Sequence, residues 1–289
     1  MNKSSRRAFI AQKYCMSTNP SPLFVEEKKG QHVYHNVWGG DDLHIGIYRP
    51  KSLSLYEANR KTTERMIKLL PKIKRASKIL VIQSGFGGAA RYIADTYKCK
   101  VWCLNDDEKQ NEYNERKIEE LELSKKVKVA KGFVEYMPYE PDYFDFVIAQ
   151  DAFSLTGKKK ETFRAIHRVL KPEGRLIISA LMRSETCEAI GSENLINKLP
   201  LEELITEEQY GKDAKRGFLQ QIYSIELSDQ LVHHYTKVLY TLQANKEKLV
   251  EQSSEHFVQD RIKTYKNFIR LAEDGCLDWG ILMFQKMNG

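Results

Sequence analysis

The chain has 289 residues, of which 42% are hydrophobic and 29% charged, and its 46 basic and 39 acidic side chains leave a net charge of +7. This length provides one large or two modest domains, and no apolar run reaches the roughly 18 residues that a membrane-spanning helix needs. Because basic residues alternate with acidic ones, as at 26–29 and 115–119, the charge favours solvated faces over a nucleic-acid-binding stripe. An anionic small substrate is compatible with this balance.

The cysteines and the start of the chain bear on the compartment. Five cysteines form an odd set with no C-x-x-C pair and no histidine at a metal-ligand spacing, which predicts a reducing compartment and no structural zinc. The first 25 residues contain no Asp or Glu and are rich in Ser and Thr. Residues 1–30 are therefore expected to form a disordered or flexible basic tail, or alternatively an organelle transit peptide. We expect a cytoplasmic protein, with an organelle as the alternative.

Residues 34–48 gather aromatic side chains, histidines and glycines with neither helical nor strand periodicity. Such a segment suits a loop that lines a pocket, the alternative being a surface loop whose rings pack onto the body. Residues 53–70 then have apolar side chains at helical spacing and stop at Pro71, which predicts a helix over one face of a sheet.

Residues 78–116 predict the centre of the fold. The apolar run 79–82 is typical of a buried parallel strand, and the sequence GFGGAA at 85–90 fits the G-x-G-x-x-A turn that opens a nucleotide-binding helix. A second strand at 101–104 closes a βαβ unit and ends at Asn105, 20 residues after the first glycine, where a polar side chain reaches ribose hydroxyls. The alternative is a tight strand-to-helix turn without a ligand.

The following residues continue the alternation of strands and helices. Strands are predicted at 127–130, 146–149 and 175–179, with a helix at 160–170 that ends in Lys171-Pro172-Glu173-Gly174. Alternating strands and helices predict a doubly wound parallel sheet, in which the carboxyl ends of the strands form the ligand edge.

After Met182 the pattern changes. Residues 183–210 are polar and are expected to form a mobile cover, followed by a strand at 218–227. Ser228-Asp229 is expected to cap a helix that begins at Gln230. An amphipathic helix at 255–272 and a strand at 277–284 complete the chain.

Several motifs together resemble the class I S-adenosylmethionine-dependent methyltransferases, and within them the sarcosine/dimethylglycine and glycine/sarcosine N-methyltransferase branch. The broad motifs are GFGGAARYIA, QDAF and LKPEG, each beside a predicted strand. The narrower motifs, specific to this branch, are VWGGDDLHIGIY, CLNDDEKQNEYNER, DQLVHHYTKV and DWGILMFQK. The resemblance runs from about residue 34 to residue 286.

The resemblance implies an α/β fold, a Rossmann-like doubly wound seven-stranded sheet whose last strand is antiparallel, with an N-terminal helical segment and an inserted helical cap. It divides the chain into five parts. These are a basic tail at 1–30, a segment covering the cofactor site at 31–75, a cofactor-binding core at 76–182, a substrate cap with one core strand at 183–275, and the final strand at 276–289.

The resemblance also implies S-adenosylmethionine as the cofactor and a set of site residues. Its cofactor-binding residues would be Gly85 and Gly87 at the methionyl end, Asn105 and Asp106 on the ribose, Gln110 over the nucleoside, and Phe133 and Gln150 near adenine and the sulfonium. Its substrate-binding residues would be Tyr34, Trp38, His44 and Tyr48. Its catalytic residues would be His233, His234, Tyr235 and Asp151.

Some positions depart from the family pattern. Val81 stands where the family usually has an acidic residue, and Gln83 stands where it usually has a glycine. On the acceptor side, Ala180-Leu181 replaces a polar pair, which favours a larger or more apolar acceptor than sarcosine.

Methyl transfer to a small-molecule acceptor is the leading functional hypothesis, and the amine of an amino-acid-like compound is the leading acceptor by resemblance. O- or C-methylation of a specialised metabolite, for example a prenyl diphosphate, is the first alternative, with His233 or His234 as a base for a hydroxyl acceptor. A non-methylating relative that acts as a binding module is the second. We expect no nucleic-acid partner and no metal, and a homodimer through the cap is an open alternative.

Overall fold

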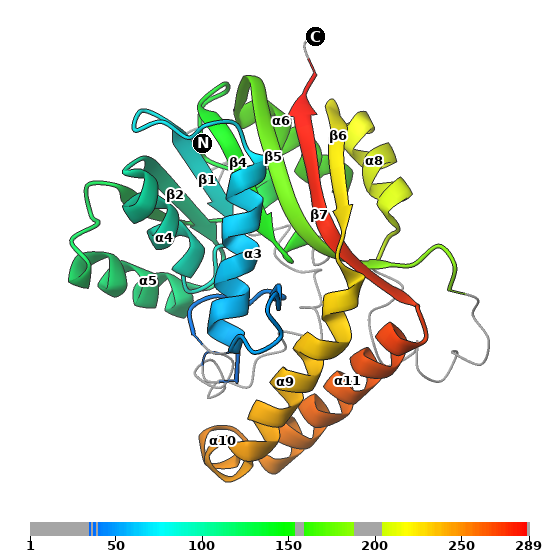
Figure 1. The fold of residues 1–289 in the computed structure, drawn as a ribbon. Coiled ribbons are helices and arrows are strands. Elements are labelled where there is room, and N and C mark those ends of the chain that lie inside the picture. The colour runs from blue at the N-terminus through cyan, green and yellow to red at the C-terminus, as the bar shows by residue number, and fades with distance from the viewer. Residues whose placement is uncertain (1–34, 36, 39, 154–158, 188–203, 288–289) are drawn as a thin grey trace, which may run out of the picture.

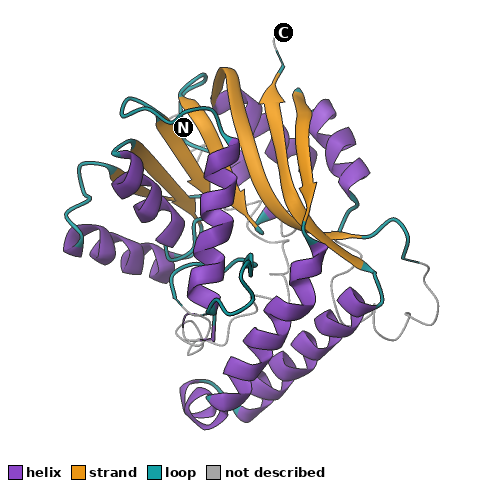
Figure 2. Cartoon of the chain, in the orientation of Figure 1, coloured by secondary structure: helices purple, strands orange, loops and turns teal. Residues whose placement is uncertain are grey.

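The structure, a computed structural model, describes residues 35, 37–38, 40–153, 159–187 and 204–287. Helices cover both faces of one seven-stranded sheet (Figure 1, Figure 2). The tail predicted at 1–30 and the predicted site residue Tyr34 lie outside the described residues. Within the described residues, no helix has both the length and the apolar character to cross a membrane.

The sheet has the strand order β3-β2-β1-β4-β5-β7-β6. Strands β1 to β6 run in the same direction, and β7 is antiparallel to both of its neighbours, as expected from the sequence. The strands are β1 (Lys78–Ile82), β2 (Lys100–Asn105), β3 (Val127–Lys131), β4 (Phe144–Gln150), β5 (Leu170–Arg183), β6 (Leu219–Glu226) and β7 (Leu277–Lys286).

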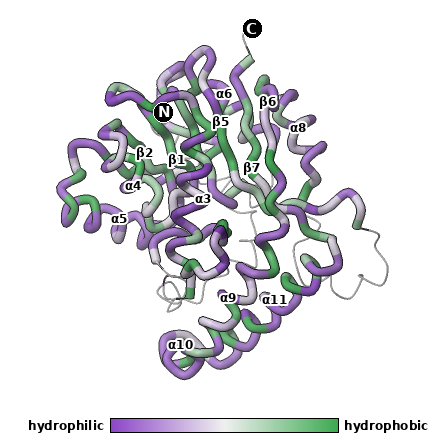
Figure 3. The backbone as a smooth tube through the Cα atoms, in the orientation of Figure 1, coloured by the Kyte–Doolittle hydropathy of each residue, from purple (hydrophilic) through white to green (hydrophobic). Residues whose placement is uncertain are grey.

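Alternate residues of the central strand β1 belong to two different cores. Ile79 and Val81 pack into the core on the side of the helices α3 (Leu55–Leu69), α4 (Gly88–Tyr97) and α5 (Glu108–Glu120). Leu80 and Ile82 face the opposite core, which contains α6 (Lys159–Val169) and α8 (Glu207–Arg216). A strand buried on both faces needs apolar residues at successive positions, and β1 carries them at 79–82 and β5 at 176–178 and 180–182 (Figure 3).

A bulge joins α6 to the long strand β5. The sequence predicts that the helix ends at 171–174 and that the strand starts at Arg175, but the strand begins at Leu170. Leu170 pairs with Phe144 and Arg175 pairs with Phe146, so four residues, including Glu173 at φ 61°, are accommodated between adjacent pairs. The ammonium of Lys171 lies 2.7 Å from Asp145 on β4, which holds this bulge against the sheet.

Helix α8 corrects the expectation of a polar cover at 183–210. Residues 188–203 lie outside the described residues, but residues 207–216 form the helix α8. The Thr206 hydroxyl caps this helix by accepting a hydrogen bond from Gln209 N at 3.3 Å. Tyr210 and Ala214 are fully buried and belong to the same core as α6, so this segment is part of the body.

A helical arm extends from the ligand edge of the sheet (Figure 1). It consists of α9 (Leu231–Ala244), α10 (Lys246–Gln252) and α11 (Glu255–Glu273), preceded by the short 3-10 helix η4 (Ser228–Gln230). The predicted Ser228-Asp229 cap is wrong, because α9 starts after Gln230 without a side-chain cap. The Ser228 hydroxyl instead accepts a hydrogen bond from Trp279 N on β7, and Asp229 forms an ion pair with Arg49.

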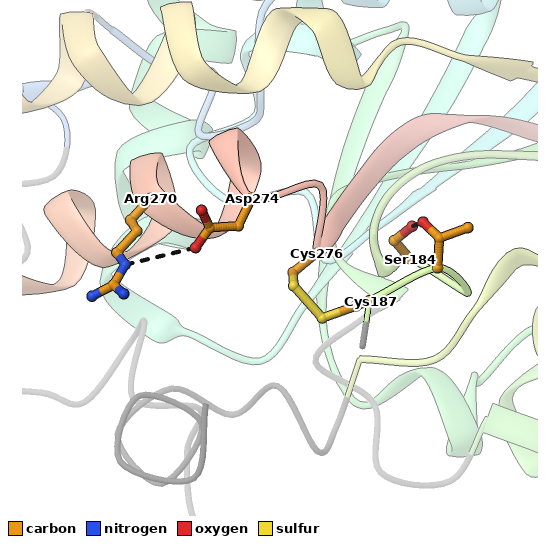
Figure 4. Close-up of a disulfide and its surroundings, with 6 residues drawn as sticks. Ser184, Cys187, Arg270, Asp274 and Cys276 are labelled. Carbon is orange, nitrogen blue, oxygen red and sulfur yellow. Dashed lines mark hydrogen bonds and ion pairs between the residues drawn. A yellow bond between two sulfur atoms is a disulfide. The ribbon is translucent and has the colours of Figure 1, made fainter. Parts of the chain in front are cut away.

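A disulfide fastens the segment after β5 to the turn between α11 and β7 (Figure 4). It joins Cys187 to Cys276, whose Cα atoms are 4.5 Å apart, while Cys99 and Cys103 are buried free thiols. Ser184 N donates a hydrogen bond to the carbonyl oxygen of Cys276 at 3.0 Å, so backbone and side chains make the same connection. The sequence analysis, which predicts a reducing compartment, did not expect this pair.

Candidate active site

The candidate site lies at the edge of the sheet where the parallel strands end. Strand β1 has β2 on one side and β4 on the other, and the connection through α4 leads only to the β2 side. The order of the strands therefore reverses between β1 and β4, and an open α/β sheet binds its ligand at such a point. The predicted site residues divide into a cofactor side, at the ends of β1 to β3, and an acceptor side, formed by Asp151 after β4, residues 38–48 and the start of α9. Gln150, predicted to bind the cofactor, is the last residue of β4 and lies between the two sides.

The glycine turn after β1 combines an open position with a packed one. Gly85 and Gly87 have φ angles of 53° and 79°, which favour glycine. A Cβ on Gly85 would find its nearest neighbour, Gln110 Oε1, 4.0 Å away, so a ligand can approach the backbone here. A Cβ on Gly87 would overlap the Asn114 amide, and this position is glycine because α5 packs against it.

Asn105 and Phe133 lie at the ends of the next two strands. Asn105 is buried at the end of β2, and its amide Nδ2 donates a hydrogen bond to Gln110 Oε1 at 3.0 Å. Asp106, the next residue, is exposed. Phe133, which follows β3, is 52% exposed, so one face of its ring is free to stack on a flat ligand. Asn105 and Phe133 thus lie at the ligand edge of the sheet, and their contacts to ribose and adenine stay predictions.

A buried arginine, which the sequence analysis did not single out, links the cofactor side to the segment before α3. Arg91 on α4 is 4% exposed and donates hydrogen bonds to Phe86 O at 2.6 Å, to Asn114 and to Asp41. Although burial raises the pKa of Asp41, the hydrogen bond from His35 and the charge of Arg91 hold it below its usual value. This ion pair therefore positions residues 41–48 across the site.

Residues 41–48, which we call the front segment, reach the acceptor side at His44 and Ile45. The Gln150 amide Nε2 donates to His44 Nε2 and to the Thr63 hydroxyl, both at 2.9 Å. His44 itself is 3% exposed. The end of β4 is thereby connected to the front segment and to α3.

Asp151 is the polar centre of the acceptor side. One carboxylate oxygen accepts the backbone N–H of Ile45 at 2.6 Å, and the other accepts the Ser179 hydroxyl and the Trp279 indole N–H, both at 2.8 Å. These donors come from the front segment, β5 and β7. The Asp151 carboxylate therefore holds the front segment, β5 and β7 together through hydrogen bonds, and its predicted catalytic role stays a prediction.

His234 on α9 is fully buried, and its tautomer follows from its partners. The backbone N–H of Gly46 points at His234 Nδ1 at 3.3 Å, and the Tyr48 hydroxyl lies 2.9 Å from the same nitrogen. Because a backbone N–H can only donate, Nδ1 is the acceptor and Nε2 carries the proton. Among the described residues Nε2 has no hydrogen-bond partner. Burial, with smaller contributions from His44 and His233, lowers the pKa of His234 to about 3, so the ring is neutral.

The remaining predicted residues surround His234. Trp38 lies with its ring centre 5.0 Å from that of His234, and its indole N–H donates to the Tyr265 hydroxyl at 3.1 Å. His233 is partly exposed and contacts Lys51 O at 3.1 Å, at the rim of the group. Tyr235 stacks on Phe268 of α11 with ring centres 4.9 Å apart, so it packs α9 against α11 within the arm.

The sequence and fold of the chain are similar to those of known proteins. Residues 80–178 match a family model described as a methyltransferase domain. The sarcosine/dimethylglycine N-methyltransferase of Aphanothece halophytica is 32% identical over 264 residues, which cover 91% of this chain and 95% of the relative. The chain belongs to the S-adenosylmethionine-dependent methyltransferases.

Two further likenesses agree with this assignment. The glycine/sarcosine/dimethylglycine N-methyltransferase of Actinopolyspora halophila is 31% identical over 270 residues, 93% of this chain and 47% of the relative, so this chain spans about half of that protein. A crystal structure from Galdieria sulphuraria, of a candidate sarcosine dimethylglycine methyltransferase, has a TM-score of 0.84 at 28% identity, covering 91% of this chain and 98% of that chain. The predicted family, fold class and enzymatic class are confirmed.

The methyltransferase uses S-adenosylmethionine as its cofactor, and the residues at the cofactor side fit that ligand. A ligand can approach the backbone at Gly85, because the space in front of it is open. The half-exposed ring of Phe133 offers a stacking face, and the Asn105 amide lies at the end of β2. When bound, S-adenosylmethionine supplies a methyl group on a positively charged sulfur.

Proposed function

We propose that this methyltransferase transfers the methyl group to the amine of an amino-acid-like compound. The relatives from Aphanothece halophytica and Actinopolyspora halophila are N-methyltransferases whose names specify glycine, sarcosine or dimethylglycine. The observation that carries the proposal to this chain is the Nε2–H of His234, a buried donor without a partner among the described residues. A carboxylate oxygen of an amino acid is an acceptor of the right kind for that group.

The neutral state of His234 suits this role. The hydrogen bonds that Nδ1 receives from Gly46 and Tyr48 fix the proton on Nε2. The ring can therefore donate a hydrogen bond to the methyl-accepting substrate but cannot remove a proton from that substrate. An amino group needs no base beyond being unprotonated when it attacks, whereas a hydroxyl acceptor would need one. The fixed tautomer therefore favours an amine over a hydroxyl acceptor.

Orientation is the main task that the protein performs. In-line displacement at a methyl group requires the nucleophile, the methyl carbon and the sulfur to be aligned, and such positioning can contribute about 7–11 kcal/mol to lowering the barrier. Asp151 anchors Ile45, and His234 anchors Gly46 and Tyr48, so the front segment is held at three of the four residues 45–48. We propose that Trp38, His44 and Tyr48 form the walls of the acceptor pocket on this support.

The location, partners and domain division are also proposals. We propose a cytoplasmic enzyme of small-molecule metabolism without a nucleic-acid partner, with a homodimer through the cap and an organelle location as the alternatives. The Cys187–Cys276 disulfide counts against the cytoplasm and supports the alternative location, because disulfides persist in compartments that oxidise thiols. We propose the division into 31–75, 76–182, 183–275 and 276–289, supported by the positions of α3, the strands β1 to β5, the arm and β7, although α8 and β6 in the third part belong to the body.

An acceptor screen tests the proposal. Formation of S-adenosylhomocysteine would be measured with glycine, sarcosine and dimethylglycine, and in parallel with phenols and geranyl diphosphate. We expect turnover with an amino-acid acceptor, and turnover confined to a phenol or a prenyl diphosphate would overturn the proposal.

Two variants of His234 sharpen the screen. His234→Gln keeps an N–H donor near the Nε2 position and should preserve the acceptor KM within a few-fold, whereas His234→Phe removes the donor and should raise that KM at least tenfold. Calorimetric binding of S-adenosylhomocysteine serves as the control for folding. Equal acceptor KM values for the two variants would mean that His234 does not bind the methyl acceptor.

A further inference from the structure

Gln83 combines two features that a folded protein rarely keeps without a use. It follows the last residue of β1 directly and has a φ angle of 46°, in the left-handed region. A residue with a Cβ avoids this region, and such residues persist where the site around them needs the conformation. The conformation turns the chain into the loop that leads to Gly85.

The side chain of Gln83 adds a second observation. Its amide oxygen Oε1 is buried and has no hydrogen-bond partner among the described residues. A buried acceptor without a donor is costly, and almost all buried polar atoms in folded proteins are paired. An N–H group of a bound ligand would satisfy this atom.

The order of the strands indicates which end of the ligand meets Gln83. Along the ligand edge, the half-exposed ring of Phe133 follows β3, Asn105 ends β2, and Gln83 follows β1. Aromatic faces stack on bases, and a polar group at the end of β2 is suited to ribose hydroxyls. With adenine over β3 and ribose over β2, the amino-acid end of S-adenosylmethionine lies over β1.

The carboxylates near the turn are already paired. Asp41 and Asp42 approach Gly88, where a Cβ would meet both of them. Asp41 is paired with Arg91, and Asp42 lies 3.2 Å from Arg60. Val81, in the strand itself, is buried in the core and carries no acceptor.

We propose that Gln83 is a cofactor-positioning residue whose amide oxygen accepts a hydrogen bond from the ammonium group of S-adenosylmethionine. The amide replaces a carboxylate in holding the amino-acid end, and the left-handed backbone directs it there. This inference depends on the cofactor alone and is independent of the acceptor named under Proposed function.

Calorimetric titration with two ligands tests the proposal without any methyl acceptor. S-adenosylhomocysteine has the amino-acid end, and 5′-methylthioadenosine lacks it. We expect Gln83→Ala to weaken binding of S-adenosylhomocysteine at least tenfold and to leave binding of 5′-methylthioadenosine within twofold of the unaltered protein. Gln83→Glu, which has the same shape and an acceptor oxygen, should bind S-adenosylhomocysteine within a few-fold of the unaltered protein.

Asn105→Ala is the matched control, because both ligands contain the ribose. This change should weaken the two ligands by similar factors. Thermal unfolding of each variant without ligand checks that the fold is intact. Equal weakening of both ligands by Gln83→Ala, or no weakening of S-adenosylhomocysteine, would overturn the proposal. Loss of the amino-acid acceptor activity would leave it unaffected.

Discussion

The cofactor side and the acceptor side of this methyltransferase are built in opposite ways. On the cofactor side, the ring of Phe133 is half exposed, the space in front of Gly85 is open, and Gln83 Oε1 has no partner among the described residues. On the acceptor side, Asp151 and His234 are surrounded by donors and rings from distant segments. Groups on the cofactor side are thus left for a ligand to contact, whereas most polar groups on the acceptor side are already hydrogen-bonded within the chain.

This difference implies that substitutions on the two sides should act on different quantities. Changes on the acceptor side should lower stability, because they break contacts that already exist in the folded chain. Changes on the cofactor side should lower affinity and leave stability nearly unaltered. Four experiments test this comparison.

Breaking the Cys187–Cys276 disulfide should have the largest effect. The sequence separation of 89 residues implies, in the chain-entropy model, about 4–5 kcal/mol of stabilisation. We expect dithiothreitol to lower the midpoint of thermal unfolding, and Cys187→Ser to lower it equally while abolishing the response to dithiothreitol. An unchanged midpoint on reduction would mean that the acceptor side does not depend on this link.

Asp151→Ala should have the next largest effect. It leaves the Ile45 N–H, the Ser179 hydroxyl and the Trp279 indole N–H without their acceptor. Hydrogen bonds to charged groups contribute about 1.5–3 kcal/mol each, and we expect a loss of about 3 kcal/mol after relaxation, measured by urea denaturation. Asp145→Ala, on the other end of β4, also removes contacts to Lys78 N and Lys171 but should leave the acceptor KM unchanged. A comparable rise of KM in both variants would contradict the distinction.

The buried His234 should make stability depend on pH. Its pKa is lowered from 6.5 to about 3 in the folded protein, so below pH 6.5 the unfolded chain takes up a proton that the folded chain does not. The free energy of unfolding should therefore fall by about 1.4 kcal/mol per pH unit below pH 6.5, until the folded-state pKa is reached. His234→Gln should remove most of this slope, and His233→Gln, at the partly exposed rim, should retain it. Equal slopes in the two variants would argue against a neutral buried His234.

Phe133→Ala should have the smallest effect on stability. The ring is 52% exposed, so the free energy of unfolding should change by less than about 0.5 kcal/mol. Loss of a stacking face should nonetheless weaken S-adenosylhomocysteine about tenfold by calorimetry, since stacking on a base contributes about 1–3 kcal/mol. Tyr136, three residues along and 64% exposed, is the control, and Tyr136→Ala should leave the affinity unaltered.

The same comparison explains what could be predicted from the sequence. Most of the cofactor side comes from one continuous stretch of the sequence. The glycine turn and Asn105, the last residue of β2, belong to a single βαβ unit, whose geometry fixes the spacing between them. Its strands, helices and family follow from local patterns, and the structure places them where they are expected.

The acceptor side depends on contacts between residues that are far apart in the sequence. Ile45 and Asp151 are 106 residues apart, Tyr48 and Gln230 are 182 apart, and Gly46 and His234 are 188 apart. No local pattern encodes such pairs, so histidines at 233 and 234 look alike in the sequence although only one is fully buried. The disulfide and the role of Ser228 were not predicted for the same reason. Cys187 bonds to Cys276, beside β7, and the Ser228 hydroxyl accepts a hydrogen bond from Trp279 in β7.

The disulfide also changes how the molecule responds to a protease. Cys187 and Cys276 close a covalent ring that contains α8, β6 and the entire helical arm. One peptide-bond cut anywhere inside that ring opens the chain but releases no fragment, and a gel run without reductant would show a single band of full mass. With reductant, the same sample would separate into two pieces whose sizes locate the cut.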